Sequence, residues 1–541
     1  MTTASTSSTR AVRRPGASRQ ERRWPLPVAM VVGLLALWML SAALLSGTHL
    51  VPYPWELAGR IVQDAPLLGA NIGPTLRVAA LGFLFGALAV LPLAAVGVVW
   101  APVEPIVMRV AVVVHVIPFV AIAPIIVVTM PGEPARVTIA ALQVYFPLLI
   151  GVLLGLKSTD ERAVDVVTTS GGGRWAVLRY VRLPSAVPNL LGALQIAVPA
   201  AVLGALIAEF FGADRGLGAI LVNAQDSLLT ERVWAIALTI GAIATLGYGL
   251  VTLIGRLVFP WAGRGASVGT TVAGAEQATV ARWQLILGSV VSAALLLGLW
   301  WSLRPAFQLD AFFVKDPIDV LRFLTEGNML TSEPASVFWS RFAVATAETG
   351  VHAGIGFVVG TAVAVLGAIA LVAVPGLERA AMPFAIVLRS MPLVALTPLI
   401  VLLFGRGLFG VTVLITLVTF FPTLVTVILG LRAAPEGAID VIRASGGSPL
   451  SAALRVRLLY AVPAITASAR IAIPAAVSGA MLAEWLATGD GLGDMITLAA
   501  VNADYFTLWS AGALVVVLVL ALYGLVNVVD RAVSRRLGVA F

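Results

Sequence analysis

Long apolar stretches recur along the chain, and shorter polar stretches separate them. Each apolar stretch holds about 20 residues, the length that an α-helix needs to cross the hydrocarbon core of a bilayer. The stretches lie at approximately 26–46, 75–99, 106–130, 136–156, 188–211, 233–256, 283–302, 342–372, 380–404, 408–431, 463–487 and 508–529. The pattern therefore predicts an all-α integral membrane protein of about twelve transmembrane helices, about six in each half of the chain.

The composition agrees with residence in a bilayer. Of the 541 residues, 60% are hydrophobic and 11% are charged, and the mean hydropathy is +1.00. A soluble globular protein carries about 25% charged residues, so that class is excluded. The sequence contains no cysteine, which excludes disulfides and thiolate metal sites.

The net charge is +8, and arginine carries it almost alone, since Lys157 and Lys315 are the lysines of the sequence. A basic protein could bind nucleic acid, but basic loops beside transmembrane helices are typical of the positive-inside rule. We therefore expect contacts with membrane lipid and no nucleic-acid partner. The abundance of Ala, Val, Gly, Leu and Arg is typical of a high-GC genome, so we expect the plasma membrane of a bacterial cell.

The distribution of basic residues predicts the topology. Residues 1–24 form an arm rich in Thr, Ser and Arg, which we expect to be disordered and cytoplasmic. The first apolar stretch is too long for the core of a signal peptide, so we expect it to be kept as a helix. Two transmembrane domains are expected at 25–258 and 282–541, joined by a cytoplasmic linker at 259–281, with the C-terminus also cytoplasmic.

The second half of the chain repeats the first. Segment 146–218 returns as 421–493 at a constant offset of 275 residues, so that Glu209 corresponds to Glu484. An even number of spans in each half gives the halves the same orientation, with a pseudo-two-fold axis along the membrane normal. Inverted-repeat secondary transporters have their axis in the membrane plane, so they are disfavoured. A parallel-repeat, ATP-independent secondary transporter stays open as an alternative.

A glycine-rich loop occurs in each half, between the expected fourth and fifth spans. The glycines at 171–173 are expected to end one helix and to turn the chain sharply before a short second helix. In the repeated loop, Ser448 is a favourable N-cap and Pro449 suits the first helical position. The short helix presents apolar side chains such as Trp175 to a partner groove, or else it lies on anionic lipid through its arginines.

These two loops resemble the EAA loop of ABC-importer permeases, in which an acidic residue and two small residues precede a glycine and a short helix. Asp165 and Asp440 stand at the acidic position, and both copies depart from the literal Glu-Ala-Ala. Segments 388–407, 208–218 and 483–493 also resemble permeases of the nitrate/sulfonate/taurine type. The fusion is a departure from that family, because such permeases are usually separate subunits that dimerise.

The resemblance implies a type I ABC importer permease fold with two homologous, parallel six-helix halves. It implies two copies of a cytoplasmic ABC ATPase, which would bind ATP and Mg²⁺, and an extracytoplasmic substrate-binding protein. The residues that it assigns to ATPase coupling are Asp165, Gly171, Gly172, Gly173, Arg174, Trp175, Leu178, Asp440, Gly446, Gly447, Ser448, Pro449 and Leu450. The expected function is ATP-driven import of a small solute. An organic anion such as a sulfonate, a nitrate-like compound or a carboxylate is favoured over a neutral or cationic vitamin precursor or amine.

The sequence carries no P-loop ATPase motif. A P-loop needs its lysine directly after a glycine, and neither Lys157 nor Lys315 stands in that context. The HExxH motif is also absent, and the three histidines are too scattered to predict a metal site. We therefore expect a subunit that is not an enzyme and binds no cofactor of its own.

Ionisable residues inside a membrane are costly and indicate function. His115 and Arg389 occupy equivalent positions in the repeat, as do Gln195 and Arg470. These four residues are candidates to line a substrate path, in which the arginines would attract an anion through their planar guanidinium groups. The alternative for each arginine is a packing hydrogen bond between helices.

Glu209 and Glu484 lie near the outer ends of the two fifth spans. We assign them to an outer gate. A capping or ion-pair role there is favoured over a cation site.

Overall fold

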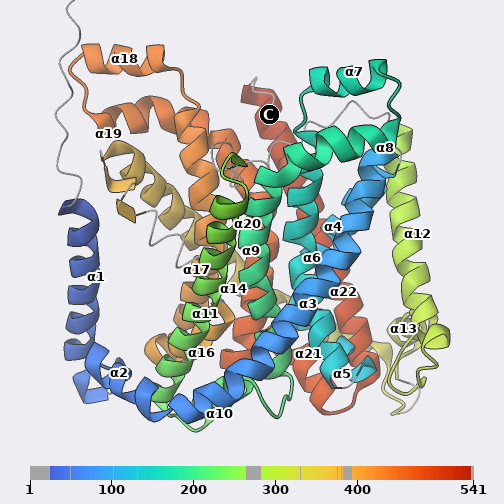
Figure 1. The fold of residues 1–541 in the computed structure, drawn as a ribbon. Coiled ribbons are helices and arrows are strands. Elements are labelled where there is room, and N and C mark those ends of the chain that lie inside the picture. The colour runs from blue at the N-terminus through green and yellow to red at the C-terminus, as the bar shows by residue number, and fades with distance from the viewer. Residues whose placement is uncertain are drawn as a thin grey trace, which may run out of the picture.

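The computed structural model describes residues 25–48, 50–100, 103–130, 132–262, 282–328, 331–374, 376–378, 380–381 and 393–537. These residues form a bundle of long helices (Figure 1), and within them the extended structure is limited to one bridge between Asn328 and Glu333. In this part of the chain, nine helices are long and apolar enough to cross a membrane, or ten if one bent pair counts as a single span. The predicted all-α membrane class is therefore confirmed. The expected span at 380–404 lies partly outside the described residues.

The first half contains eleven α-helices and two short helical turns. In chain order they are α1 (Pro25–Leu44), η1 (Ser46–Thr48), α2 (Pro54–Gln63), α3 (Ala65–Val99), α4 (Glu104–Val116), α5 (Phe119–Thr129), α6 (Glu133–Lys157), α7 (Glu161–Thr169), α8 (Arg174–Val177), the π-helical turn η2 (Leu178–Arg182), α9 (Leu183–Phe210), α10 (Leu217–Asp226) and α11 (Thr230–Val258).

The second half repeats this order as far as it is described. It contains α12 (Arg282–Ala306), α13 (Pro317–Glu326), α14 (Ala335–Ala373), α16 (Leu393–Phe404), α17 (Leu408–Arg432), α18 (Glu436–Ala444), α19 (Pro449–Ala452), the π-helical turn η4 (Ala453–Arg457), α20 (Leu458–Ala483), the π-helical turn η5 (Glu484–Thr488), α21 (Gly491–Val501) and α22 (Tyr505–Leu537).

Each half is built on three long helices that pack closely, α3–α6–α9 in the first and α14–α17–α20 in the second. Small residues allow the close approach. A Cβ added to Gly82 of α3 would lie 2.3 Å from the Cβ of Ala140 on α6, and one added to Gly430 of α17 would lie 3.1 Å from the Cα of Ala461 on α20. Glycine and alanine at such contacts bring helix backbones together, which is how helices gain packing energy in a membrane.

The apolar stretch 106–130 does not form the single straight helix that its length predicts. The chain bends by 94° between α4 and α5, where Ile117 (ψ 122°) and Pro118 (ψ 129°) take extended conformations. The expectation of an uninterrupted span is therefore wrong. The cause is Pro118, because proline disfavours the helical conformation in the residue before it and cannot donate a backbone hydrogen bond.

The two halves interlock. Helix α5 of the first half packs against α21 and α22 of the second, and α16 of the second half packs against α10 and α11 of the first. Helix α12, the first helix of the second half, packs against α4 of the first half and stands at one edge of the molecule, while α1 stands at the opposite edge (Figure 1). The loops α7–α8 and α18–α19 lie at one end of the bundle, and α2, α10 and α21 lie at the other. We call these the α7/α18 end and the α10/α21 end.

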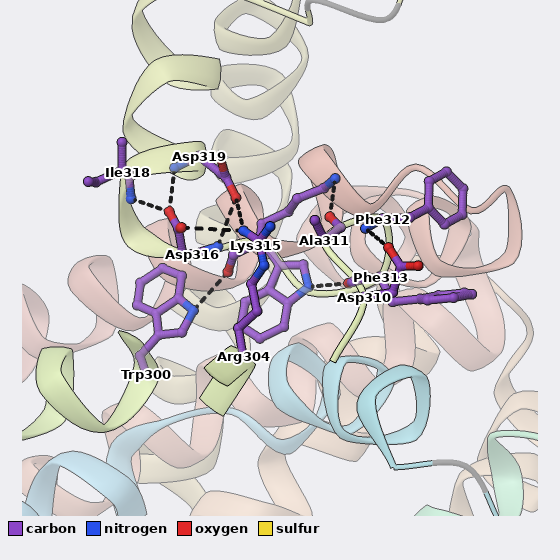
Figure 2. A network of polar contacts seen from close by, with 11 residues as sticks. Trp300, Arg304, Asp310, Ala311, Phe312, Phe313, Lys315, Asp316, Ile318 and Asp319 are labelled. Atoms are coloured by element: carbon purple, nitrogen blue, oxygen red, sulfur yellow. Dashed lines mark hydrogen bonds and ion pairs between the residues drawn. The ribbon is translucent and has the colours of Figure 1, made fainter. Parts of the chain in front are cut away.

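A pair of stacked tryptophans ties the first helix of each half to the last. The Trp300 and Trp509 rings are 5.7 Å apart, and their indole N–H groups donate to the carbonyls of Lys315 and Phe313, each at 3.0 Å. Figure 2 shows this segment and its contacts. The same arrangement recurs in the first half, where the rings of Trp38 and Trp234 are 6.2 Å apart and their indoles donate to Pro52 and Leu50.

Figure 2 also shows the polar contacts that surround this segment in the second half. Lys315 is 5% exposed; its ammonium group donates to the Ala311 carbonyl at 2.9 Å and lies 3.9 Å from the centre of the Phe506 ring. Burial lowers the pKa of Lys315. Asp316 caps α13 by accepting from the backbone N–H groups of Ile318 and Asp319, both at 2.8 Å.

In each half, the short outer helix (α2 or α13) meets a core helix (α3 or α14) and the last helix (α11 or α22). The contacts at this junction are ionic in the first half and aromatic in the second. In the first half, the Asp64 carboxylate accepts two hydrogen bonds from Arg232 at 2.9 Å and one from Arg60 at 2.8 Å. The Arg232 guanidinium, with help from Arg60, holds the pKa of Asp64 below its usual value. In the second half, Phe323 packs against Phe338 at 5.1 Å and stacks on Phe506 at 5.5 Å.

Candidate functional site

The two glycine-rich loops have the same backbone conformation. Helices α7 and α18 each end before a glycine in the left-handed region, Gly171 (φ +83°) and Gly446 (φ +75°). Such a residue after a helix is typically glycine, because a Cβ would strain this conformation. The prediction that these glycines end one helix and turn the chain is confirmed.

The next glycine in each loop is required by packing. A Cβ on Gly172 would lie 2.5 Å from the Val167 side chain and 2.7 Å from its carbonyl oxygen. A Cβ on Gly447 would meet Ile442 at 2.5 and 2.8 Å. A Cβ added to Gly173 would have no atom within 4 Å, so packing does not require a glycine at this position.

The short helices after the turns present apolar side chains at the surface of the α7/α18 end. Trp175 is 58% exposed and Leu450 is 51% exposed. Ser448 accepts a hydrogen bond from the Ser451 N–H at 3.2 Å, and Pro449 is the first helical residue, as the sequence predicts. Arg174, Asp165 and Asp440 are also exposed.

Leu178 differs from its predicted neighbours. It is only 6% exposed and belongs to the hydrophobic core, so its side chain is not part of the exposed apolar surface of the loop. The reason is that α8 continues into η2 without a break, and η2 packs against α6 and α9.

Equivalent ion pairs hold each loop to the bundle, and hydrogen bonds from equivalent arginines add contacts to different helices. Lys157 pairs with Glu104 in the first half, and Arg432 pairs with Glu378 in the second. Two arginines then brace the π-helical turns. Arg182 donates to the Val98 carbonyl at 3.0 Å, and Arg457 donates to the Leu431 carbonyl at 3.3 Å.

A single helical run joins each loop to the opposite end of the bundle. The run in the first half covers Arg174–Phe210, and the run in the second covers Pro449–Thr488. A force applied to Trp175 or Leu450 can therefore be transmitted along one continuous element to the α10/α21 end.

At the α10/α21 end, each run ends at a buried glutamate, Glu209 (2% exposed) or Glu484 (0% exposed). Each glutamate accepts a hydrogen bond from the N-terminal turn of the following helix, at 2.7 Å from Gly218 to Glu209 and at 3.0 Å from Gly493 to Glu484. A carboxylate is stabilised there by free N–H groups and by the helix dipole. These geometries agree with the capping alternative.

The rest of the cap comes from α3 and α14. In the first half, Asn71 accepts from the Gly216 N–H at 2.8 Å, and Thr75 accepts from the Leu217 N–H at 2.8 Å. In the second half, Glu348 accepts from the Gly491 N–H at 2.9 Å, and Thr349 accepts from the Leu492 N–H at 2.9 Å. Helices α10 and α21 are thus fixed to the core helices through their first turns.

The two glutamates have unequal surroundings. Glu484 also accepts from the Thr349 hydroxyl at 2.8 Å and lies 3.0 Å from His352 Nδ1. The equivalent of His352 in the first half is Val78. Glu209 Oε1 is buried without a hydrogen-bond partner.

Aromatic side chains directly after the glutamates meet between the halves. Trp485 stacks on Phe211 at 4.2 Å and 12°, and its edge approaches Phe210 at 6.1 Å. Gln225 donates to the Leu486 carbonyl across the same interface at 3.3 Å. Phe210 and Trp485 occupy equivalent repeat positions, so this contact lies at the pseudo-two-fold axis.

The three path candidates that the structure describes have partners on three different helices and do not form one cluster. Arg389 lies outside the described residues. Gln195 donates to the Thr252 hydroxyl at 3.1 Å. Arg470 is paired with the buried Asp530, which also accepts from Thr466 at 2.7 Å. These contacts agree with the packing alternative for Arg470.

Among the path candidates that the structure describes, His115 is the exposed one. Its imidazole stacks on Phe146 of α6, with the ring centres 3.6 Å apart and an interplanar angle of 8°. Sequence reasoning missed Phe146 and also Asp530, Phe211 and Trp485. The repeat offers a signal for one of them, since Trp485 corresponds to an aromatic residue, Phe210.

Comparisons with known proteins bear on this arrangement. A family model described as "Binding-protein-dependent transport system inner membrane component" matches residues 93–260 and 354–538. The riboflavin transport system permease protein of Chloroflexus aurantiacus is 31% identical over 252 residues, which cover 45% of this chain and 93% of that protein.

Two further relatives match to a similar extent. The formylaminopyrimidine transport permease protein of Halalkalibacterium halodurans is 26% identical over 237 residues, covering 43% of this chain and 95% of the relative. The taurine transport system permease protein of Escherichia coli is 27% identical over 265 residues, covering 45% and 94%. Each relative is matched over nearly its whole length by less than half of this chain.

Proposed function

This chain belongs to the family of binding-protein-dependent transport system inner membrane components, as two fused ABC importer permease domains, and we propose that it imports a small organic anion into a bacterial cytoplasm. A permease component of this family is not itself a catalytic enzyme. The observation that carries the proposal is the duplicated loop, in which a sharp glycine turn presents Trp175 or Leu450 at the start of a helix that reaches the α10/α21 end.

In this proposal the α7/α18 end is cytoplasmic, and both chain termini are on the same side. Two copies of an ABC ATPase dock on segments 165–184 and 440–459, so that each copy receives exposed apolar side chains, including Trp175 in one loop and Leu450 in the other. ATP and Mg²⁺ bind to those ATPases and not to this chain. Closure of the two ATPases draws the loops together and turns the attached helical runs.

The α10/α21 end faces outward and receives an extracytoplasmic substrate-binding protein. The contact of Trp485 with Phe211 and Phe210 is the closed outer gate. Glu209 and Glu484 act there by fixing α10 and α21 to the gate-bearing runs. Rotation of the runs separates Trp485 from Phe211 and opens a path between the halves.

The relatives support two classes of cargo. Taurine and aliphatic sulfonate permeases among them favour an organic anion such as a sulfonate, a nitrate-like compound or a carboxylate. Arg470 contributes little to this choice, since Asp530 already neutralises it. A vitamin precursor is the second candidate, because permeases for riboflavin and formylaminopyrimidine are also similar to this chain.

The test is ATPase activity of the full chain with the ABC ATPase encoded beside its gene, in lipid nanodiscs. The neighbouring binding protein and candidate solutes are added separately and together. We expect stimulation that needs both the binding protein and one solute. If no ATPase associates with the chain, the import proposal is wrong, and an ATP-independent secondary transporter takes its place.

A further inference from the structure

The exposed ring of His115 lies deep in the bundle. It is eleven residues from Glu104, the first residue of α4, so it lies about 16 Å along the helix from the α7/α18 end. Helix α4 is surrounded by α3, α6, α12 and α22. His115 stacks on Phe146 of α6, so its side chain lies on the side of α4 that packs against α6.

The orientation of α4 supports this placement. Arg109 of α4 lies against Gly288 of α12, at the edge of the molecule (Figure 1). His115 is six residues further on, which places it about 120° around the helix from Arg109. It therefore points away from α12 and toward α6, where it meets Phe146.

Phe146 and the His115 imidazole form a parallel pair. Phe146 covers one face of the imidazole in a parallel stack, yet His115 remains exposed. A planar ring could continue the stack on the other face. Stacking of this kind requires a flat π system, so a small alkyl sulfonate or a nitrate-sized ion gains little from it.

The outer gate has a related geometry. Phe211 and Trp485 come from different halves and stack nearly parallel, at 4.2 Å and 12°. Opening the gate separates them and loses the stacking energy. A planar cargo that passes between the two rings replaces that contact with its own, whereas a saturated cargo does not.

We propose that the exposed face of His115, backed by Phe146, is a binding station for cargo with a planar aromatic ring. The inference rests on the proposed import function and narrows its cargo class. An aromatic carboxylate and a neutral heterocycle both fit, because the station selects for planarity and not for charge. The stack of Phe211 on Trp485 favours passage of the same class of molecule.

The station can be tested by direct binding to the purified full chain in lipid nanodiscs. Lumichrome, a planar fluorescent tricycle, serves as the probe, and empty nanodiscs of the same lipid correct for partition into the bilayer. We expect saturable quenching that benzoate, a planar anion, competes for and ethanesulfonate, a saturated anion, does not. Stacking of one aromatic pair is worth about 1 kcal/mol, which corresponds to about fivefold in affinity.

Three variants locate the binding. His115→Leu should weaken lumichrome binding about fivefold or more, and His115→Phe should keep it, because phenylalanine retains a stacking face. Phe421→Leu is the matched control, since Phe421 is the repeat counterpart of Phe146 but is buried at 8% exposure. This control should leave the affinity unchanged while its thermal midpoint reports any general loosening of the fold.

The outcomes test the binding station and the import function independently of each other. Equal lumichrome affinity in the wild type and His115→Leu would overturn the station, as would competition by ethanesulfonate equal to that by benzoate. Absence of saturable quenching would do the same. In each case, ATPase association measured on the same nanodiscs decides the import proposal independently, because it depends on the loops at the α7/α18 end.

Discussion

The unequal surroundings of the two buried glutamates lead to a quantitative prediction. Glu209 and Glu484 occupy equivalent positions and cap equivalent helices, so the same substitution at each is an internal control for the other. We expect Glu484→Ala to lower the free energy of unfolding more than Glu209→Ala. The volume removed is identical, and both side chains are almost fully buried, so cavity effects largely cancel.

The magnitude follows from the hydrogen bonds that each carboxylate accepts. Glu484 is within 3.0 Å of donors on Thr349, His352 and Gly493. Glu209 accepts from Gly218, and its Oε1 has no partner. A buried donor left without its acceptor costs about 1–3 kcal/mol. The Thr75 hydroxyl interacts with Glu209 as Thr349 does with Glu484, so His352 is the additional donor of Glu484 and predicts a difference of about 1–3 kcal/mol in the free energy of unfolding.

The assay is reversible unfolding by sodium dodecyl sulfate, followed by far-UV circular dichroism of the full chain in mixed micelles. Tryptophan fluorescence gives a second probe of the same transition. A Glu484→Gln variant should fall between the wild type and Glu484→Ala, because an amide oxygen still accepts a hydrogen bond without the charge. Equal losses for the two alanine variants, or a larger loss for Glu209→Ala, would refute the reasoning from hydrogen-bond partners.

Three further predictions concern other parts of the molecule. Trp175→Asp and Leu450→Asp should each weaken ATPase association in pull-down without shifting the thermal midpoint, because both side chains are more than half exposed; a matched loss of stability would contradict this. Arg470→Leu should destabilise the chain by about 3–5 kcal/mol because it strands the buried Asp530 carboxylate, and adding Asp530→Leu should restore part of the loss in a double-mutant cycle. Since arginines lower the pKa of Asp64, its carboxylate stabilises the fold above about pH 4 and this contribution is lost as the pH falls through the depressed pKa. The difference in the free energy of unfolding between the wild type and Asp64→Asn should therefore decrease as the pH falls. A difference that increases would contradict this reasoning.

The sequence predicted the membrane class, the duplication and the glycine turns from local signals. About 20 consecutive apolar residues are enough to specify a spanning helix, because the bilayer demands internal backbone hydrogen bonding regardless of neighbours. The turn at Gly171 and the cap at Ser448 depend on residues within a few positions in the chain. Repetition at one offset then indicated that both halves share these features.

Sequence patterns did not predict features that depend on residues far apart in the chain. The path assignment of Arg470 could not be weighed without knowing that Asp530, 60 residues later, neutralises it. The capping role of Glu484 depends on α14, more than 130 residues earlier in the chain. Pro118 was visible in the sequence, but the size of the bend, 94°, is set by the helices that pack around α4 and α5.

The sequence by itself therefore determined that the chain is an all-α membrane protein, that it has two similar halves, and where each loop turns. Only the tertiary structure decided which polar groups pair inside the membrane and which aromatic rings meet between the halves, Trp485 on Phe211 above all. The physical reason is the separation along the chain between the residues that determine each feature. Helix formation and turns are governed by contacts within a few residues, whereas a buried charge or an aromatic stack depends on whichever side chain the packing of helices brings within about 4 Å.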